Sequence, residues 1–368
     1  MSVPKAYLLV TNDLIADQRV EKMAGVYEEL GFHVVLVGRK RKSKYEPSDW
    51  KVKRFRLLFN KGPLFYLSYS LRLFRFLMSR KSVDIVVSND ADTLLGAGLA
   101  RIFRPFFWVY DSHEYFVGVP EIKDKPFVQK VWKWIEQKYV PKTRLRLTVS
   151  GAVSQLLEKR GLGQFLVVRN IPKKKESIKT VPWSERPFRI LYPGMINPGR
   201  GLEAFLEAVP LMKSDVQVVI MGRGPNENAL KDKMLGLDIE DRVRFTGAVP
   251  YARVWEEMKA THLGLVLEEP LGASFAAALP NKIFDFMQAG IPVLAGEELP
   301  EVMHLLSEVP FARFVDGSPE SIAQAVDYLA DNEQAYKELQ GKAVLHRDNY
   351  TWEQERKVVL DELGRYFY

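Results

Sequence analysis

The sequence predicts an α/β protein made of two doubly wound domains, each with a parallel β-sheet. Apolar strand patterns alternate with helical patterns along almost the whole chain, which is typical of parallel sheets covered on both faces. At 368 residues the chain is also longer than one hydrophobic core usually supports. Residues 1–180 carry 34 Lys and Arg against 17 Asp and Glu, whereas the rest carries 19 against 29. This asymmetry favours two domains with different partners.

The first half begins with a βαβ unit. A short apolar run at 7–11 predicts a buried strand, and Asp17 is placed to cap the helix that follows, which Gly31 ends. Further strands are expected at 32–37, 52–58, 84–88, 107–110, 146–149 and 166–168. Most of them are separated by helical patterns, so we predict a Rossmann-like domain over 1–171.

Residues 172–187 are polar and basic and show neither a helical nor a strand period, which predicts an interdomain linker. A second α/β series covers 188–350. Its strands are expected at 188–192, 216–221, 243–245, 263–267 and 291–294, and its helices at 201–211, 226–235, 251–259 and 318–329. The closing stretch, 351–368, has the pattern of an amphipathic helix.

Residues 279–293 predict a short helix with both ends marked. Pro280 suits the first turn, and Gly290 suits the left-handed position that ends a helix. Lys282 and Asp285 lie three residues apart, near the start of this helix. A cation, a helix N-terminus and a carboxylate together suit a phosphate with a ribose beside it. The alternative is a surface ion pair on an ordinary crossover helix.

Two glycine-bearing turns follow strands of the second domain: 192–201, which contains Gly194, Arg200 and Gly201, and 222–225, which begins Gly222-Arg223-Gly224. Open α/β sheets bind ligands at the carboxyl ends of their strands. Arg200 is placed at a helix start, where it could clamp a phosphate together with Lys282. A dinucleotide fingerprint at 222–228 lacks its third glycine, so a tight turn is the better interpretation.

Polar and acidic residues also follow three strands of the first domain. They are Asn12, Asp13, Asp17 and Arg19 after the first strand, Asn89, Asp90 and Asp92 after the strand at 84–88, and Asp111, His113 and Glu114 after the strand at 107–110. Each of them alone could be a helix cap, and for Asp17 the cap is favoured. All three groups at one edge of a sheet favour a polyhydroxyl or cationic site.

Several classes of site are absent from the sequence. The five histidines are scattered without metal-ligand spacing, there is no cysteine, and neither a phosphate-binding Walker loop nor a serine nucleophile motif occurs. No signal peptide or membrane-spanning run is apparent, so a cytoplasmic location is the expectation. The basic first half should attract an anion: a membrane surface, nucleic acid or a phosphorylated acceptor. The alternative is a solvated basic surface.

Two aromatic and basic helical patterns, at 62–81 and 127–142, suit a membrane interface. They suit equally well crossover helices whose arginines extend their charged ends to water.

On these motifs the chain resembles, over nearly its whole length, the family 4 glycosyltransferases, which are group 1 glycosyl transferases of GT-B architecture with two facing α/β domains. The resemblance lies in 194–201, 222–225, 242–249 and 280–293 of the second domain. The first domain is similar to a subgroup with Asp17-Gln18-Arg19-Val20 after its first strand and Tyr110-Asp111-Ser112-His113-Glu114 further on. The Trp352 segment resembles the family's helix that crosses back to the first domain.

The resemblance implies roles for individual residues. Arg200 and Lys282 would hold the donor diphosphate, Asp285 would take the ribose hydroxyls, and His113 would lie against the donor sugar. The other donor-binding positions would be Gly194, Gly201, Gly222, Arg223, Gly224, Thr246, Gly247, Ala248, Val249, Pro280 and Asn281. The acceptor side would comprise Asn12, Asp13, Asp17, Arg19, Asp90, Asp92 and Glu114. The family has two signature glutamates, but here Ala277 replaces the first and Asp285 the second.

We therefore expect a retaining glycosyltransferase that uses a nucleotide-diphosphate sugar and needs neither a metal nor another cofactor. The basic, aromatic first domain suggests a lipid-linked or surface-polysaccharide acceptor and an anionic membrane surface, with peripheral attachment to its inner face. Two alternatives stay open, because Ala277 departs from the signature: a non-catalytic sugar-nucleotide-binding subunit and a sugar-nucleotide epimerase of the same architecture. No known nucleic-acid-binding module is present, so we expect no nucleic-acid partner.

Overall fold

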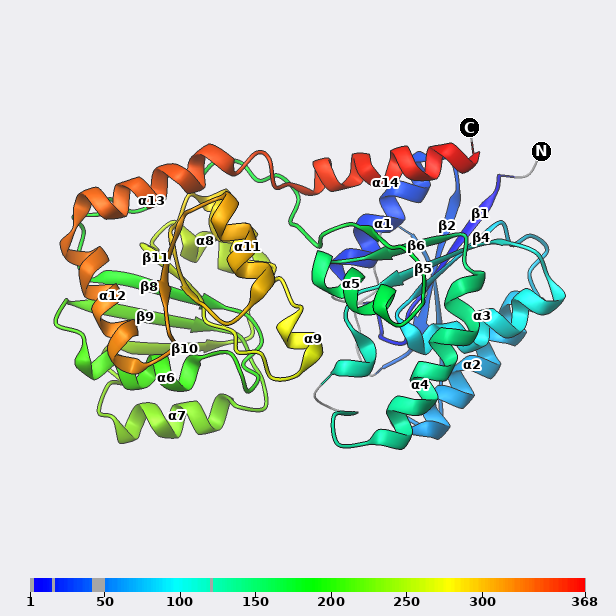
Figure 1. Cartoon of the computed structure of the whole chain (residues 1–368), viewed down its shortest axis with the longest axis horizontal. Helices are drawn as coiled ribbons and strands as arrows, with labels where there is room; N and C mark the ends of the chain where they lie inside the picture. Colours follow the sequence, from blue (N-terminus) through cyan, green and yellow to red (C-terminus); the bar gives the residue numbers. More distant parts are fainter. Residues whose placement is uncertain (1–2, 15–16, 42–49, 120–121, 368) are drawn as a thin grey trace. The chain divides into compact units, whose positions relative to one another are not determined.

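The chain forms two compact units (Figure 1). We analysed a computed structural model that describes residues 3–14, 17–41, 50–119 and 122–367. The first unit comprises Met1–Asn170 and Glu355–Tyr368, and the second comprises Ile171–Gln354. Residues 172–187, expected as a separate linker, belong to the second unit. There Val181 donates its backbone N–H to the Lys259 carbonyl at 2.8 Å, and Trp183 Nε1 donates to the Leu329 carbonyl at 2.9 Å.

The first unit contains a seven-stranded, wholly parallel sheet with the order β3-β2-β1-β4-β5-β6-β7. Its strands are β1 Lys5–Leu9, β2 His33–Arg39, β3 Lys51–Phe55, β4 Ile85–Asn89, β5 Phe107–Ser112, β6 Leu145–Thr148 and β7 Leu166–Val167. The central strands are buried on both faces, as a parallel sheet under two helical layers requires. The strand order reverses between β1 and β4, which makes their carboxyl ends the switch point of this sheet.

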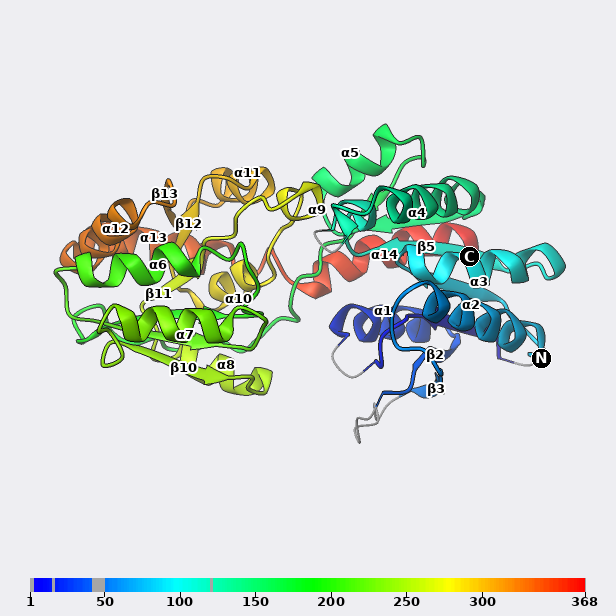
Figure 2. The ribbon, with the colours of Figure 1, turned by 90° about the horizontal axis from the view of Figure 1, so that it is seen from below.

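Helices cover both faces of the first sheet. They are α1 Gln18–Glu29, α2 Pro63–Met78, α3 Ala91–Phe103, α4 Pro126–Tyr139, α5 Gly151–Lys159 and α14 Trp352–Phe367. Figures 1 and 2 show α2, α3 and α4 side by side on one face, and α1 and α14 lie on the other. The end of α14 is fixed by aromatic packing, because Tyr366 and Phe367 both contact the Phe107 ring of β5.

The second unit contains a six-stranded parallel sheet with the order β10-β9-β8-β11-β12-β13. Its strands are β8 Phe188–Pro193, β9 Val216–Met221, β10 Val243–Gly247, β11 Leu263–Val266, β12 Val293–Gly296 and β13 Ala312–Val315. Here the order reverses between β8 and β11. Loops that follow these two strands therefore meet at the switch point of the second sheet.

The helices of the second unit form two layers. They are α6 Leu202–Ala208, α7 Glu227–Gly236, α8 Tyr251–Met258, α9 Ala273–Ala276, α10 Lys282–Ala289, α11 Pro300–Glu308, α12 Pro319–Asp331 and α13 Glu333–His346. Residues of α6, α7 and α12 share one core with Phe188, Ile190 and Tyr192 of β8. Residues of α8, α10 and α11 form a second core on the opposite face, with Leu191 of β8. The sheet is therefore doubly wound.

The predicted fold class is confirmed. Every strand that the sequence predicts in either unit is present, with boundaries shifted by a few residues. The structure adds β13, which pairs with β12 at the sheet edge, together with α3, α5, α9, α11 and α13. Among the described helices, none combines the length and the apolar character needed to span a bilayer.

Candidate functional site

Helix α10 carries the two charged residues that the sequence singles out. It begins at Lys282, after Asn281 in the N-cap position, and ends at Gly290, which adopts the left-handed conformation with φ 70°. Ile283, Phe284, Phe286 and Met287 are buried in the core of this face of the sheet. Lys282 is buried too, with 8% of its surface exposed, so the alternative of a surface ion pair on this helix is wrong.

Lys282, Arg200 and Glu268 form one charged cluster. We call Arg200 and Lys282 the cation pair, and Glu268 is their counter-ion. Lys282 Nζ lies 2.6 Å from Glu268 Oε1, and Arg200 Nη1 lies 3.6 Å from the same oxygen. Glu268 follows β11, and Arg200 lies in the loop after β8. These are the two strands at the switch point of the sheet, which is why residues 68 positions apart in sequence meet there.

The surroundings of Lys282 lower its pKa. Burial disfavours the ammonium form and is the largest effect, Glu268 opposes it, and Arg200 adds repulsion, so the pKa falls from 10.5 to about 8. The ammonium also lies 3.8 Å from the centroid of the Tyr192 ring, a cation–π contact from β8. At neutral pH Lys282 is charged, but it loses its proton within two pH units of neutrality.

Three loops at the carboxyl ends of the strands are joined by backbone hydrogen bonds. Gly194 N–H donates to the Met221 carbonyl at 2.8 Å, and Gly222 N–H donates to the Gly247 carbonyl at 2.9 Å. A Cβ on Gly222 would collide with the Gly194 carbonyl oxygen, so only glycine permits this approach. The predicted loops around Gly194, Gly222 and Gly247 therefore lie together.

The other donor-side positions lie on the same loops. Ile196 N–H donates to the Arg223 carbonyl at 3.0 Å, and Thr246 Oγ1 donates to the Gly247 carbonyl at 3.0 Å. The Arg200 loop lies against the residue that follows β11, because Gly201 has no side chain. A Cβ on Gly201 would collide with the Leu267 carbonyl oxygen. The remaining positions are Gly224, which lies close to Ile196, exposed Ala248 and Asn281, and half-buried Val249 and Pro280.

Asp285 lies one turn after Lys282 and accepts a short hydrogen bond from the Tyr251 hydroxyl of α8. Burial, together with the Asp285 carboxylate, raises the pKa of Tyr251, so the phenol stays a donor. Lys175 Nζ lies 4.8 Å from the centroid of the Tyr251 ring. Ala277, which replaces the first signature glutamate, is buried at the end of α9.

In the first unit, Arg19 is an interior residue. Its Nε lies 3.1 and 3.0 Å from the two carboxylate oxygens of Asp111, and its Nη1 donates to the Val168 carbonyl at 2.7 Å. Burial would raise the pKa of Asp111, but Arg19 and His113 outweigh it and hold that pKa far below its usual range. Asp17 caps α1 by accepting from Val20 N–H at 3.1 Å, as expected.

His113 lies between two acidic side chains. Its Nδ1 is 3.6 Å from Asp90 Oδ2 and its Nε2 is 3.7 Å from Asp111 Oδ2, while Asn89 Oδ1 lies 3.1 Å from Nε2. Burial lowers the pKa of His113, but Asp90 and Asp111 overcome this effect and raise it to about 9. His113 is therefore an imidazolium ion at neutral pH.

Asp92, at the start of α3, accepts a short hydrogen bond from the Thr11 hydroxyl after β1. Burial, with repulsion from Asp90, raises the pKa of Asp92 to about 7. Asn12 Nδ2 donates to Asp17 at 2.7 Å. Asp13 is half-buried in the same loop, and the Glu114 carbonyl accepts from Ser112 at 2.9 Å. The acidic residues expected after β1, β4 and β5 thus share one edge of the first sheet.

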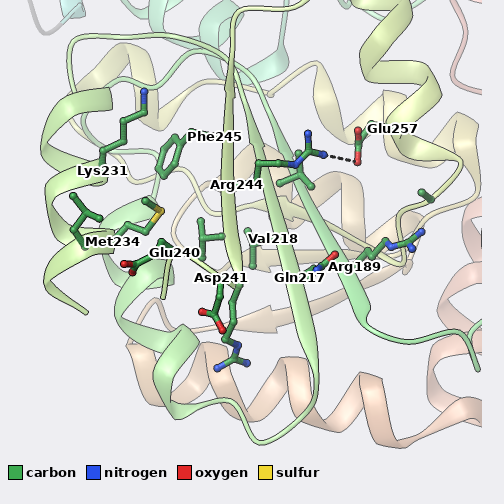
Figure 3. Close-up of a pocket in the computed structure, with 15 residues that line it drawn as sticks. Arg189, Gln217, Val218, Lys231, Met234, Glu240, Asp241, Arg244, Phe245 and Glu257 are labelled. Atoms are coloured by element: carbon green, nitrogen blue, oxygen red, sulfur yellow. Dashed lines mark hydrogen bonds and ion pairs between the residues drawn. The ribbon is translucent and has the colours of Figure 1, made fainter. Parts of the chain in front are cut away.

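A cavity of about 700 Å³ lies elsewhere in the second unit, beside the edge strand β10 (Figure 3). Arg189, Gln217 and Arg244 line it, and each lies at or next to the start of its strand. This is the amino end of the sheet, opposite to the loops described above. Figure 3 shows Arg244 turned toward Glu257 of α8, and the two side chains form an ion pair at 3.3 Å.

Glu268 is the site residue that the sequence did not indicate. No motif includes it, and its neighbour Glu269 makes the position ambiguous. One signal was available, because Glu268 directly follows the strand expected at 263–267, just as Asp111 follows the strand expected at 107–110.

Comparisons with known proteins agree with this geometry. Residues 173–344 match the family model described as glycosyl transferases group 1. Sucrose-phosphate synthase from Thermosynechococcus elongatus is similar in structure, with a TM-score of 0.80 and 15% identity over 98% of each chain.

Two further structures are similar. HepE from Anabaena, solved with UDP and glucose, has a TM-score of 0.74 and 15% identity over 98% of this chain and 100% of its own. WaaG, described as a glycosyltransferase involved in lipopolysaccharide biosynthesis, has a TM-score of 0.61 and 11% identity over 97% and 98%. No curated protein matches the sequence. The expected resemblance to group 1 glycosyltransferases is confirmed over residues 173–344, and the chain has the GT-B fold of these structures.

Proposed function

We propose that this chain, which carries a group 1 glycosyltransferase domain on a GT-B fold, moves a sugar from a nucleotide-diphosphate sugar to an acceptor with retention of configuration and without a metal ion. The observation that carries the proposal is the cation pair of Arg200 and Lys282 at the switch point of the second sheet. One carboxylate faces two cations there, which leaves one positive charge for an anion.

The chemistry follows from where negative charge develops. When the bond between the sugar C1 and the β-phosphate oxygen breaks, the leaving nucleoside diphosphate gains charge on that phosphate. Arg200, Lys282 and the N-terminus of α10 stabilise it, as fixed cations and dipoles do in a site that excludes water. The acceptor hydroxyl bonds to C1 on the face that the diphosphate leaves, and its proton passes to the leaving phosphate oxygen.

The remaining donor contacts follow the same geometry. Asp285 takes the ribose hydroxyls, and Tyr251, which now donates to it, gives way or turns with it. The loops of Gly222–Gly224 and Thr246–Val249 frame the base. HepE was solved with UDP-glucose, which makes uridine-linked sugars the first donors to test.

In the first unit, His113 supplies a positive charge next to the donor sugar. Its imidazolium is held by Asp90 and Asp111, and Arg19 fixes Asp111 from behind. Arg19 is thus a positioning residue rather than a contact for the acceptor. Asp90, Asp92 and their neighbours would bind acceptor hydroxyls.

The acceptor is a lipid-linked or surface-polysaccharide intermediate, reached at an anionic membrane surface. Three neighbouring helices, α2, α3 and α4, carry exposed apolar side chains, which on α3 lie only at its end, and we call these residues the α2–α4 surface. Its apolar members are Leu64, Leu67, Leu71, Met78, Ile102, Phe103, Phe127, Val131 and Trp134. Exposed cations interleave with them, namely Arg72, Arg75, Lys130, Lys133 and Lys138. Apolar stripes bordered by cations are typical of surfaces that dock on anionic lipid.

A panel of sugar nucleotides tests the proposal. The donor should raise the melting temperature of the chain by mass action, and the same donor, radiolabelled, should transfer its sugar or hydrolyse slowly, with undiminished rate in excess EDTA. Binding without transfer or hydrolysis would favour a non-catalytic subunit instead. Conversion of the donor into another sugar nucleotide without an acceptor would favour an epimerase.

A further inference from the structure

We infer that Glu268 is the positioning residue of the donor site: its carboxylate holds Arg200 and Lys282 together and sets the net charge that the donor diphosphate meets. The inference rests on the proposed function. Its geometric basis is that a single oxygen, Oε1, lies 2.6 Å from Lys282 Nζ and 3.6 Å from Arg200 Nη1.

The cluster is unsaturated. Within the described part of the chain, Glu268 Oε2 and Arg200 Nε are buried and have no hydrogen-bond partner. The Arg19–Asp111 pair of the first unit is different, because Asp111 accepts with both oxygens and the Val168 carbonyl takes a further donor of Arg19. Buried polar atoms without partners are costly, so their presence beside a cation pair indicates a place that a ligand completes.

Glu268 has two opposite effects on an anion. Its negative charge repels a diphosphate directly. It also keeps Lys282 protonated, because a buried ammonium without a carboxylate partner loses its proton at lower pH. The groups that face Lys282 are Glu268 after β11, Arg200 after β8 and the Tyr192 ring of β8. Of these groups, Glu268 is the anion, and its charge favours the ammonium form of Lys282.

Removing the charge of Glu268 should therefore strengthen diphosphate binding at low pH and weaken it at high pH. In Glu268→Gln, repulsion is gone, so a diphosphate binds more tightly at low pH, where Lys282 is protonated in both proteins. At higher pH the variant has lost the Lys282 proton while the wild type still holds part of it, so the variant binds more weakly. A residue that only maintains the fold would weaken binding at every pH.

The test uses the full chain and inorganic pyrophosphate, a probe that does not depend on the base or the sugar. We expect the ratio of the variant Kd to the wild-type Kd to lie below one near pH 6 and to be about fivefold higher near pH 8, since lowering the Lys282 pKa from about 8 by one unit leaves roughly a tenth instead of half of the ammonium form at that pH. The control is Glu257→Gln, which removes a carboxylate from the Arg244 pair in the same unit and should keep the ratio near one.

A ratio that is constant with pH, whether one or larger, overturns the inference. A second measurement needs no ligand: competitive labelling of lysine amines, followed by peptide mass spectrometry, gives the pKa of Lys282. It should be about 8 in the wild type and at least about one unit lower in Glu268→Gln. If the wild type binds no pyrophosphate, the proposed donor pocket fails. An unchanged Lys282 pKa in the variant overturns the role of Glu268 separately.

Discussion

At the scale of single residues, the chain uses buried cations in two ways. Arg19 donates to Asp111 and Val168 and is closed off by them, so its charge serves the fold. Lys282 and Arg200 share one carboxylate, so the cluster has a net positive charge. Since a buried charge is tolerated only when it is paired or about to be paired, the second arrangement is the one that suits an anionic ligand.

Arg200→Ala and Lys282→Ala should each weaken binding of a nucleoside diphosphate. Loss of a charge-assisted hydrogen bond to the ligand costs about 1.5–3 kcal/mol, which is roughly 10- to 150-fold in Kd. Isothermal titration calorimetry with the best nucleotide of the panel measures this directly. Arg244→Ala, at the other end of the sheet, is the control and should leave Kd unchanged. Unaltered affinity in both site variants would exclude this pocket for the donor.

His113 should give the first unit a pH-dependent stability. Its folded pKa of about 9 is above the ordinary value of 6.5, so the stabilisation is complete below pH 6.5 and is lost as pH rises through 9. The difference in unfolding free energy between the wild type and His113→Gln should fall by about 1–3 kcal/mol between those limits. Urea unfolding at a series of pH values measures it, and a difference that does not vary with pH would contradict it.

At the scale of elements, the donor loops depend on a close backbone approach. The turn after β9 can reach the turn after β8 only because position 222 has no side chain. Its φ of 152° is also rare for a residue with a Cβ. The loop geometry is therefore fixed by one residue type at one position.

Gly222→Ala should lower the free energy of unfolding and the donor affinity together, because the Gly194 loop must move away. We expect a loss of at least about 2 kcal/mol in stability, the usual range for a strained backbone position. The matched control is Gly236→Ala at the end of α7, where a Cβ meets nothing within 4 Å and the helix gains from alanine. If the two variants unfolded at the same denaturant concentration, the close approach would not matter.

The sequence predicts helices and strands well where the apolar periodicity is strong. It predicts contacts between them poorly. The end of α10 at Gly290 follows from glycine placement, whereas the helix begins at Lys282, two residues after Pro280, which the sequence places in its first turn. The edge strand β13, with four residues and two half-buried side chains, has no pattern strong enough to separate it from a loop. Glu268 could not be joined to Lys282 from sequence, because their contact depends on how β11 and α10 pack, and no local rule encodes that.

At the scale of the whole molecule, the uneven charge has a structural counterpart in the first unit. The basic excess of residues 1–180 includes exposed cations on α2 and α4, and apolar side chains on the same helices remain exposed, such as Phe127 at 77% and Trp134 at 52%. Lys138 lies 4.6 Å from the Trp134 ring. Isolated apolar residues on a surface are ordinary, but many exposed apolar residues on α2, α4 and the end of α3 favour a partner.

The α2–α4 surface should bind anionic vesicles. Sedimentation with phosphatidylglycerol vesicles should remove the chain from solution, neutral phosphatidylcholine vesicles should do so weakly, and salt should reduce the binding, since each cation near the surface contributes about 1 kcal/mol. Leu67→Asp with Trp134→Asp should weaken binding by at least about tenfold, because each change replaces membrane-buried apolar area with a repelled charge.

The control for this experiment is Leu235→Asp with Leu345→Asp, which places the same two charges at exposed apolar residues of α7 and α13 in the second unit. If general hydrophobicity caused the vesicle binding, this variant would lose affinity as much as the α2–α4 variant does. If charge alone caused it, the α2–α4 variant would lose only the small part that two added carboxylates explain, and high salt would abolish the rest. A dual dependence, on apolar residues of these helices and on anionic lipid, is what distinguishes a membrane-docking surface from a basic surface that is merely solvated.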